Sequence, residues 1–350
     1  MTRVFLALSF MLWPFAAFGQ VLDQPPTIGG SALAIAAQTT PQRQVPPPPP
    51  PPDNERPRRR GSMVGYIQDA VVGSKVRIRF DAGFHNDAPD RAEFFYAKCG
   101  CYRDLPTSDG AYDPDAPGPR PGAVSTLDFQ QPYLEGEYAL NDAFSVFGNV
   151  PVRWLQPKEF IPDTGGSFPN HSGISDLRAG VKFAVVSDDT RVVTVQFQAF
   201  MPTGSAENGL GTDHWSFEPS FLYYQGINER IALESEVGVW LPSGGSAGVP
   251  TSTSDKFAGT VFFYGIGPSF AGYRSDSVRF APVVELVGWH VLSGFATPTG
   301  DASGTNVVNL KIGARTTWDT RSSFYVGWGH ALTTASWYDD IVRFEYRYAF

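Results

Sequence analysis

The sequence predicts a transmembrane β-barrel, and three observations predict it: an alternating C-terminal segment, an N-terminal export signal, and two kinds of connection that take turns along the chain. In the last ten residues, Ile341–Phe350, aliphatic and aromatic side chains fall on one side of a period-two strand, whereas Arg343, Glu345 and Arg347 fall on the other. A packed soluble core rejects unpaired charges, but a polar barrel interior tolerates them. The fold class is therefore all-β, an antiparallel up-and-down barrel of about twelve strands.

The N-terminus has the three parts of a secretory signal peptide. Met1–Arg3 is basic, Val4–Phe15 is apolar, and Ala17–Gly19 is a small-x-small cleavage site, so we assign residues 1–19 to the signal. The apolar run is too short for a spanning helix, and no later window is long enough either. Export combined with alternating strands predicts a Gram-negative outer membrane protein, and an even strand number predicts that both termini are periplasmic.

Residues 20–73 are predicted to be a disordered, Pro-rich linker that precedes the barrel. Seven consecutive prolines, Pro46–Pro52, favour an extended polyproline II rod. The basic cluster Arg56–Arg60 comes immediately afterwards. Two interpretations stay open: a solvated spacer, or a periplasmic arm that touches peptidoglycan or anionic lipid head groups.

The barrel is predicted to occupy residues 74–350, with alternating segments separated by connections of two lengths. The strands are expected near 74–84, 125–139, 143–154, 173–186, 191–202, 213–226, 230–241, 256–273, 278–292, 304–318, 322–332 and 340–350. Tight polar turns are expected at 140–142, 187–190, 227–229, 275–277 and 319–321. Longer loops are expected near 85–124, 155–172, 203–212, 242–255, 293–303 and 333–339. Short periplasmic turns that alternate with long outer loops are typical of outer-membrane barrels.

Charged side chains are predicted to line the interior of this barrel. The inward set is Arg77, Arg79, Asp81, Glu135, Glu137, Arg153, Arg178, Lys182, Glu218, Glu234, Glu236, Glu285, Lys311, Arg315, Arg343, Glu345 and Arg347. Acids gather on the middle strands and bases on the first, fourth, tenth and last strands, which predicts a basic wall that faces an acidic wall. Such a field orients a polar solute in a channel. The alternative is that the charges pair across the lumen and plug it.

Composition narrows the class of protein. The chain has 36 glycines and 14% aromatic residues, which suits a β architecture, and its net charge of −8 argues against a nucleic-acid partner. Cys99 and Cys101 lie in the first long loop and form either a local disulfide or a reactive thiol pair. Two thiolates are too few ligands for a metal, so we expect no metal site and no cofactor.

The segment Gly173–Phe183 resembles a G-x-x-D-x-x-x-G-x-K-[FY] motif of the outer-membrane transporter family named for the MetA pathway of phenol degradation. Its motif positions here are Gly173, Asp176, Gly180 and Lys182. The turn 140–142 before the motif and Pro202–Gly204 after it also match, and the similarity covers roughly residues 125–350. The resemblance implies a barrel that passes small, often aromatic or hydrophobic, compounds across the outer membrane.

Two of these positions allow more than one role. Asp176 and Lys182 have an even spacing on the inward face, so one interpretation is a lumenal charge pair between them. The other is that Asp176 only fixes the junction between the loop and the strand. Gly180 suits a crowded inner wall. At the C-terminus, Tyr346, Tyr348 and Phe350 resemble the signal by which barrels are handed to the insertion machinery.

The function expected from these features is a channel for small-molecule solutes, not an enzyme. A structural or adhesive barrel without transport is the first alternative. A lipid hydrolase is the second, because His171 and Ser172 are adjacent in an outer loop. Neighbouring residues of one loop rarely align as base and nucleophile, however, because a catalytic triad is defined by spatial roles.

Overall fold

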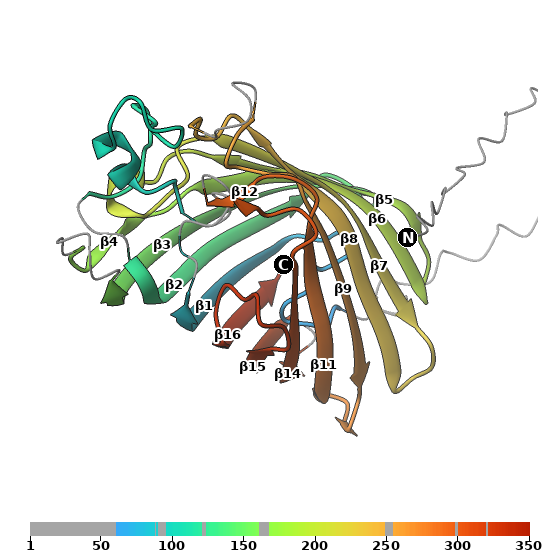
Figure 1. Ribbon diagram of the computed structural model, residues 1–350. Coiled ribbons are helices and arrows are strands. Elements are labelled where there is room, and N and C mark those ends of the chain that lie inside the picture. Colours follow the sequence, from blue (N-terminus) through green and yellow to red (C-terminus); the bar gives the residue numbers. More distant parts are fainter. Residues whose placement is uncertain are drawn as a thin grey trace, which may run out of the picture. The chain divides into compact units, whose positions relative to one another are not determined.

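A closed antiparallel β-barrel of twelve long strands is the fold of this chain in the computed structural model (Figure 1). The structure describes residues 61–87, 89, 96–120, 124–160, 168–248, 255–297, 300–319 and 321–350. The predicted signal peptide and the Pro-rich stretch up to residue 60 lie outside these residues. Consecutive barrel strands pair with each other, and β1 pairs with β16, so each strand has two neighbours.

The twelve barrel strands are β1 (Lys75–Asn86), β2 (Val124–Ala139), β3 (Phe144–Phe160), β5 (Leu177–Ser187), β6 (Arg191–Met201), β7 (Trp215–Gly226), β8 (Ile231–Ser243), β9 (Val261–Phe270), β11 (Val278–Val291), β14 (Asn306–Trp318), β15 (Ser322–Ala331) and β16 (Asp340–Ala349). Within the described parts of the connections lie four short strands and two 3-10 helices: β4 (His171–Ile174), β10 (Tyr273–Arg274), β12 (Phe295–Thr297), β13 (Gly300–Asp301), η3 (Gly100–Asp104) and η5 (Ala206–Asn208). The predicted all-β fold class and strand number are confirmed.

Closure of the barrel joins the two ends of its sequence. Ten residue pairs, from Lys75 opposite Ala349 to Phe84 opposite Asp340, form the β1–β16 register. The backbone N–H of Phe350 also donates to the carbonyl of Ser74 at 3.1 Å. A closed barrel pairs every strand edge internally, which a bilayer requires because lipid offers no hydrogen-bond partners.

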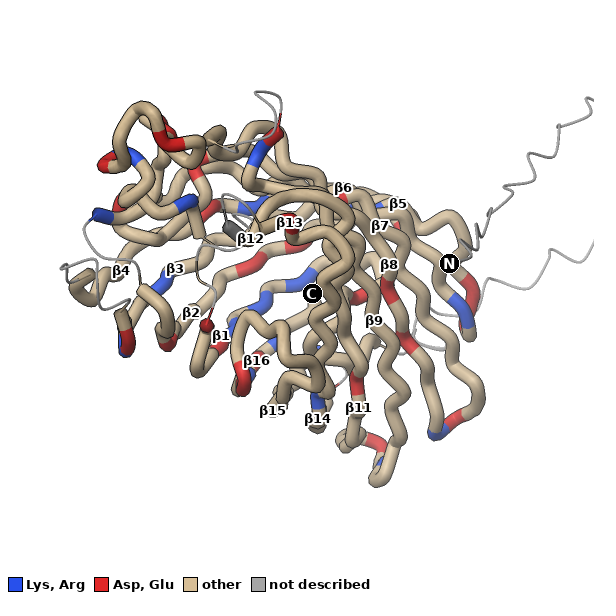
Figure 2. The backbone as a smooth tube through the Cα atoms, viewed as in Figure 1, with Lys and Arg blue, Asp and Glu red and all other residues tan. Residues whose placement is uncertain are grey.

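The two faces of the strands differ as the alternation predicts. On β16, Phe344, Tyr346 and Tyr348 are about two-fifths exposed, whereas Arg343, Glu345 and Arg347 are buried inside the barrel. Figure 2 shows charged residues along the strands as well as at their ends. An apolar outer face around a charged interior is the pattern of a barrel that sits in lipid.

Short turns gather at one end of the barrel, which we call the turn end, and long connections gather at the other, which we call the loop end. The predicted turns after β2, β5, β7 and β14 are confirmed. Most strand limits agree with the prediction to within about two residues, and the larger differences concern three strands. The strand expected at 173–186 is two strands, because Ser175 and Asp176 turn away to bond with a neighbouring loop. Strand β3 continues to Phe160, and β9 begins at Val261.

The larger correction concerns residues 61–73, which we assigned to the disordered linker. Residues 62–73, here called the plug segment, lie inside the barrel and precede β1; Met63, Val64, Ile67 and Ala70 are each at most 3% exposed. Their apolar side chains pack against lumen-facing residues of the strands. The barrel unit therefore begins before residue 74.

Among the described residues, no helix is both long enough and apolar enough to cross a bilayer. Within the same residues, no cluster of His, Cys, Asp or Glu has the arrangement of a metal site.

Candidate functional site: a lumenal plug and a cavity

The plug segment enters the lumen at the turn end, rises to mid-barrel and returns. Its first residue, Ser62, meets Arg347 near the end of the last strand, and its middle residues meet Glu285, seven residues into β11. Its later residue Ala70 accepts a bond from Thr194, near the start of β6. The segment thus forms a loop that crosses the lumen before the chain enters β1.

Three glutamates accept the backbone N–H groups on one side of this loop. Glu285 accepts the N–H groups of Gly65, Tyr66 and Ile67 at 2.8–2.9 Å. Glu234 accepts those of Met63 and Val64, and Glu236 accepts that of Gln68. Six consecutive donors are therefore bound by side chains of the wall. Each such bond to a charged group contributes about 1.5–3 kcal/mol.

Arginines of the wall donate to the backbone carbonyls of the same loop. Arg315 donates to the carbonyls of Met63 and Val64 at 3.1 and 2.8 Å, and Arg343 donates to that of Gly65 at 2.6 Å. These arginines belong to β14 and β16, whereas the glutamates belong to β8 and β11. Strands β11 and β14 are hydrogen-bonded neighbours. Because each peptide group presents both a donor and an acceptor, acceptor glutamates and donor arginines of the wall together hold this stretch of backbone.

Asp69 anchors the descending part of the plug segment. Its carboxylate lies 2.6 Å from Lys75 Nζ and 3.1 Å from Arg347 Nη1, and Lys182 Nζ donates to its backbone carbonyl at 2.9 Å. Burial alone would raise the pKa of Asp69, but these cations, Lys75 first, hold that pKa well below the usual range of a carboxyl group. Asp69 is therefore anionic in the docked segment.

The ring of Tyr325 packs against one glycine of the plug segment and one glycine of the wall. A Cβ added to Gly65 would lie 2.1 Å from the ring of Tyr325, and one added to Gly313 would lie 2.3 Å from its hydroxyl oxygen. The hydroxyl group of Tyr325 donates to Glu285 at 3.1 Å. The glycine in the plug segment therefore allows close contact with the wall.

Beyond the plug segment, toward the loop end, the lumen contains a cavity of about 200 Å³. Its aromatic lining comprises Tyr66, Tyr96, Phe129, Tyr133, Phe200, Trp240, Phe263, Trp289 and Tyr338. Its charged lining comprises Arg79, Asp81, Arg153, Asp176, Arg178, Glu218, Glu236, Lys311 and Arg343. An apolar pocket with a few convergent polar groups is the usual form of a small-molecule site.

Tyr66 and Lys311 connect the plug segment with the loop end across this cavity. Lys311 Nζ lies 4.6 Å from the ring centroid of Tyr66 and donates to the hydroxyl oxygen of Tyr338 at 2.7 Å. The guanidinium group of Arg343 also lies over the ring of Tyr66, with its Cζ 4.1 Å from the ring centroid. Burial raises the pKa of Tyr66 above its usual value, so this phenol is neutral.

Long connections pack over the loop end. Leu155, Phe168, Leu210, Trp337 and Tyr338 belong to one buried apolar cluster there. In the first long connection, Lys98 is fully buried, pairs with Asp113 at 3.2 Å and also donates to the carbonyl of Ala247. The cavity therefore lies between packed loops on one side and the plug segment on the other.

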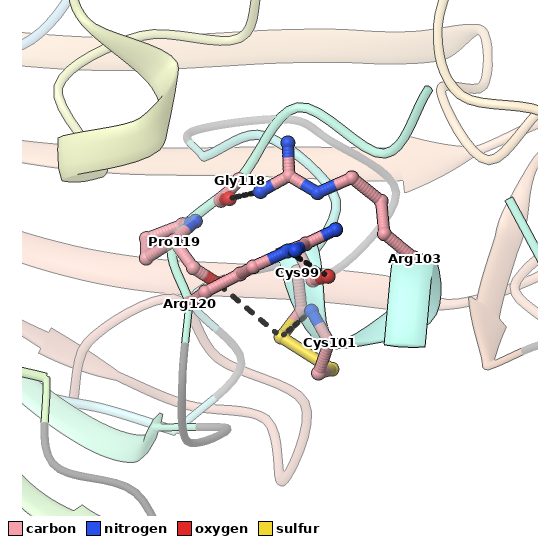
Figure 3. Close-up of a disulfide and its surroundings, with 7 residues drawn as sticks. Cys99, Cys101, Arg103, Gly118, Pro119 and Arg120 are labelled. Carbon is pink, nitrogen blue, oxygen red and sulfur yellow. Dashed lines mark hydrogen bonds between the residues drawn. A yellow bond between two sulfur atoms is a disulfide. The ribbon is translucent and has the colours of Figure 1, made fainter. Parts of the chain in front are cut away.

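Cys99 and Cys101 are joined by a disulfide at the start of η3 (Figure 3). The surrounding chain is held by side-chain to backbone bonds: Arg103 donates to the carbonyl of Gly118 at 3.1 Å, and Arg120 donates to that of Gly100 at 3.3 Å. The bridge belongs to the loop-end packing, and neither cysteine lines the lumenal cavity.

The motif residues divide between two places. Asp176 accepts bonds from the N–H groups of Gly204 and Thr212 and from the Thr212 hydroxyl group at 3.0–3.1 Å, so it ties the loop-to-strand junction. Lys182 pairs with Glu137 at 2.9 Å, and the alternative of an Asp176–Lys182 pair is not formed. A Cβ at Gly180 would lie 2.4 Å from Phe147, which accounts for glycine on that crowded wall, and one at Gly173 would meet Leu210 at 2.9 Å.

The predicted inward charges face the lumen. They do not line an open passage between two walls, because the plug segment crosses the lumen. Lys182, Glu234, Glu236, Arg315, Arg343 and Arg347 contact the plug segment. Arg77 and Glu345 belong to a wall network in which Glu345 pairs with Arg315 at 2.8 Å and Arg77 pairs with Glu135 at 2.9 Å. Of the other predicted residues, Glu285 contacts the plug segment and Glu137 pairs with Lys182. The cavity is lined by Arg79, Asp81, Arg153, Arg178, Glu218 and Lys311.

The prediction missed the plug segment and the aromatic lining of the cavity. The segment 62–72 reads SMVGYIQDAVV, with one charged residue, so its apolar composition was a signal that it differs from the preceding linker. The hydrolase candidates are not arranged for catalysis, because His171 and Ser172 are consecutive residues of β4 and point to opposite faces.

Comparison with known proteins supports the predicted resemblance. The family model described as the MetA-pathway of phenol degradation matches residues 126–243, so the resemblance is confirmed over that range. A search of curated proteins finds no match.

Solved structures with a similar chain path include an outer membrane channel from Pseudomonas putida F1, with 13% identity, 80% of this chain and 96% of that chain covered, and a TM-score of 0.45. The KdgM porin has 7% identity, coverage of 79% and 99%, and a TM-score of 0.40. LpxR from Salmonella typhimurium has 10% identity, coverage of 79% and 100%, and a TM-score of 0.42.

Proposed function

We propose that this protein is an outer-membrane channel that passes small aromatic solutes through its lumenal cavity, and that the plug segment must move for passage. The observation that carries the proposal is the aromatic cavity, which lies within a closed barrel and is separated from the turn end by the plug segment. The matching family model, which is named for phenol degradation, agrees with an aromatic solute.

The orientation proposed follows from the connections. Short turns face the periplasm in outer-membrane barrels, which puts the turn end, the plug segment and both termini on the periplasmic side. A solute from outside then enters past the packed loops, occupies the cavity and leaves when the plug segment is displaced. The basic stretch 56–60 lies outside the described residues, and its contact with peptidoglycan stays a proposal.

The wall charges have two roles in this proposal. Glu234, Glu285 and Arg315 hold the plug segment, so their effect on passage is through its docking. Selectivity for the solute rests on the cavity residues. The earlier expectation of two opposed walls applies best to the outer half of the lumen, where space remains.

Uptake into proteoliposomes tests the function. Phenyl and methyl β-glucosides carry the same polar group, cross lipid poorly and differ in the aromatic ring. We expect the refolded protein to admit the phenyl glucoside faster than the methyl glucoside. Equal rates would remove the aromatic preference, and uptake no faster than in protein-free liposomes would favour a structural barrel.

Assembly is proposed to depend on the C-terminal aromatic residues. Phe350 is 64% exposed on the outer face, and Tyr346 and Tyr348 share that face. We expect deletion of Phe350 to reduce the heat-modifiable barrel in cell envelopes, as judged by gel migration of unboiled samples. An unchanged amount would show that insertion does not read this residue.

A further inference from the structure

A cluster of two arginines and one tyrosine on the cavity wall has features that the channel proposal does not use. Arg79 and Arg178 both lie against the ring of Tyr133, at 3.8 and 5.5 Å from its centroid. Arg178 also lies 4.7 Å from the centroid of Phe200, whose ring stacks on Trp240 at 5.1 Å. Two guanidinium groups and a row of aromatic rings therefore face the same cavity.

The two arginines of this cluster differ in whether a carboxylate forms an ion pair with them. Arg79 has Asp81 at 3.6 Å, but that carboxylate makes two bonds of 2.7 Å to Arg343. Arg178 forms no ion pair with any other described residue, and its buried Nε has no hydrogen-bond partner. A guanidinium group that keeps an unused donor inside a barrel is prepared to bind an anion from the lumen.

The acids that line the cavity are mostly occupied by other groups. Asp81 is bound by Arg343, Asp176 by three loop donors, and Glu236 by the N–H group of Gln68. Glu218 is the exception, since its contact is a long one of 3.5 Å from the amide group of Gln198. Glu218 also interacts electrostatically with Arg178, so its carboxyl group competes with a solute carboxylate for that guanidinium group.

We propose that the cavity binds small aromatic carboxylates, with the carboxylate on Arg178 and the ring against the aromatic lining around Phe200 and Trp240. The inference rests on the proposed channel function and narrows its solute class from aromatic compounds to aromatic acids. Charge and ring are recognised together: the guanidinium fork matches a carboxylate, and the flat ring of the acid covers neighbouring ring faces.

Binding of radiolabelled benzoate to the refolded protein tests the inference, with unlabelled acetate, benzyl alcohol and benzylammonium as competitors. We expect benzoate to bind, acetate and benzyl alcohol to compete weakly because each supplies one of the two features, and benzylammonium not to compete. Competition by benzyl alcohol as strong as that by unlabelled benzoate would overturn the role of charge.

Variants locate the carboxylate. Arg178→Met removes the charge-assisted bonds and is expected to weaken benzoate binding about 10- to 100-fold, whereas Arg178→Lys keeps the charge and should recover part of the affinity. Glu218→Gln removes the carboxyl group that competes for Arg178 and should tighten binding. The matched control is Arg274→Met, which removes the same charge from an exposed turn-end residue and should change nothing. Heat-modified migration verifies that each variant folds.

The outcomes separate this inference from the function on which it rests. Phenyl glucoside uptake together with benzoate binding that ignores Arg178 and Glu218 would overturn the carboxylate site and leave the channel intact. If the parent protein shows neither phenyl glucoside uptake nor benzoate binding, the proposed channel function is itself overturned.

Discussion

The two halves of the lumen use the same kinds of side chain for different purposes. In the turn-end half, glutamates and arginines meet a polypeptide backbone, and Glu285 alone accepts three N–H groups from the plug segment. In the loop-end half, Arg178 faces open space beside aromatic rings. A charged side chain of the lumen therefore holds the plug segment where that segment reaches it, and is available to bind a solute where it does not.

Deleting the plug segment should have the largest effect on the difference between the two halves of the lumen. Removal of residues 62–72, which is the plug segment without its last residue, joins Gly61 to Gly73. The turn-end half then fills with water, so the single-channel conductance in planar bilayers should rise several-fold. A deletion of equal length at residues 41–51 is the control and should leave conductance at the parent level. Equal conductance of both deletions would show that the segment does not obstruct the lumen.

A single substitution at Glu285 should weaken the docking without removing the segment. In Glu285→Gln an amide nitrogen replaces one acceptor oxygen, so at least one N–H group among Gly65, Tyr66 and Ile67 loses its partner, at a cost of about 1–3 kcal/mol. We expect brief openings in single-channel records. Glu229→Gln, at an exposed turn, serves as the control, and the same opening frequency in both variants would contradict the assignment.

The smallest change is a methyl group in the plug segment. Gly65→Ala places a Cβ 2.1 Å from the Tyr325 ring, so either the segment or the ring must shift, and overpacking of this kind costs about 1–3 kcal/mol. Gly136→Ala is the control because nothing lies within 4 Å of its Cβ. Faster proteolysis of the plug segment is expected in the first variant alone, and identical cleavage rates would refute the close contact.

Most of the barrel was predictable because the sequence of each strand alternates between residues of its lipid-facing side and residues of its lumen-facing side. Arg343, Glu345 and Arg347 alternate with aromatic residues, and lipid on one side and a polar lumen on the other enforce that period. Strand limits were less predictable where a side chain has a distant partner. Asp176 interrupts a strand because it bonds to Thr212, and the distance along the chain hides that partner.

The candidate site was predictable only in part. Alternation identified the inward charges but not what they bind, since the partners of Glu234 and Arg315 are backbone atoms of a segment that has no period of its own. The cavity depends on where that segment stops. Arg178 was assigned to the lumen from its strand, whereas its position between Tyr133 and Phe200 follows from three strands meeting in space.

Locking the plug segment to the wall tests the central claim most directly. A Cβ at residue 267 lies 2.9 Å from Val64 Cγ1, so Val64→Cys with Gly267→Cys should form a disulfide in a chain that also carries Cys99→Ser and Cys101→Ser. The measurement is uptake of phenyl β-glucoside by proteoliposomes before and after reduction. We predict uptake at the protein-free background while the bridge is oxidised and uptake at the rate of the Cys99→Ser, Cys101→Ser parent after reduction. Equal uptake in the two states, with the bridge verified by mass spectrometry, would contradict the claim that the plug segment must move.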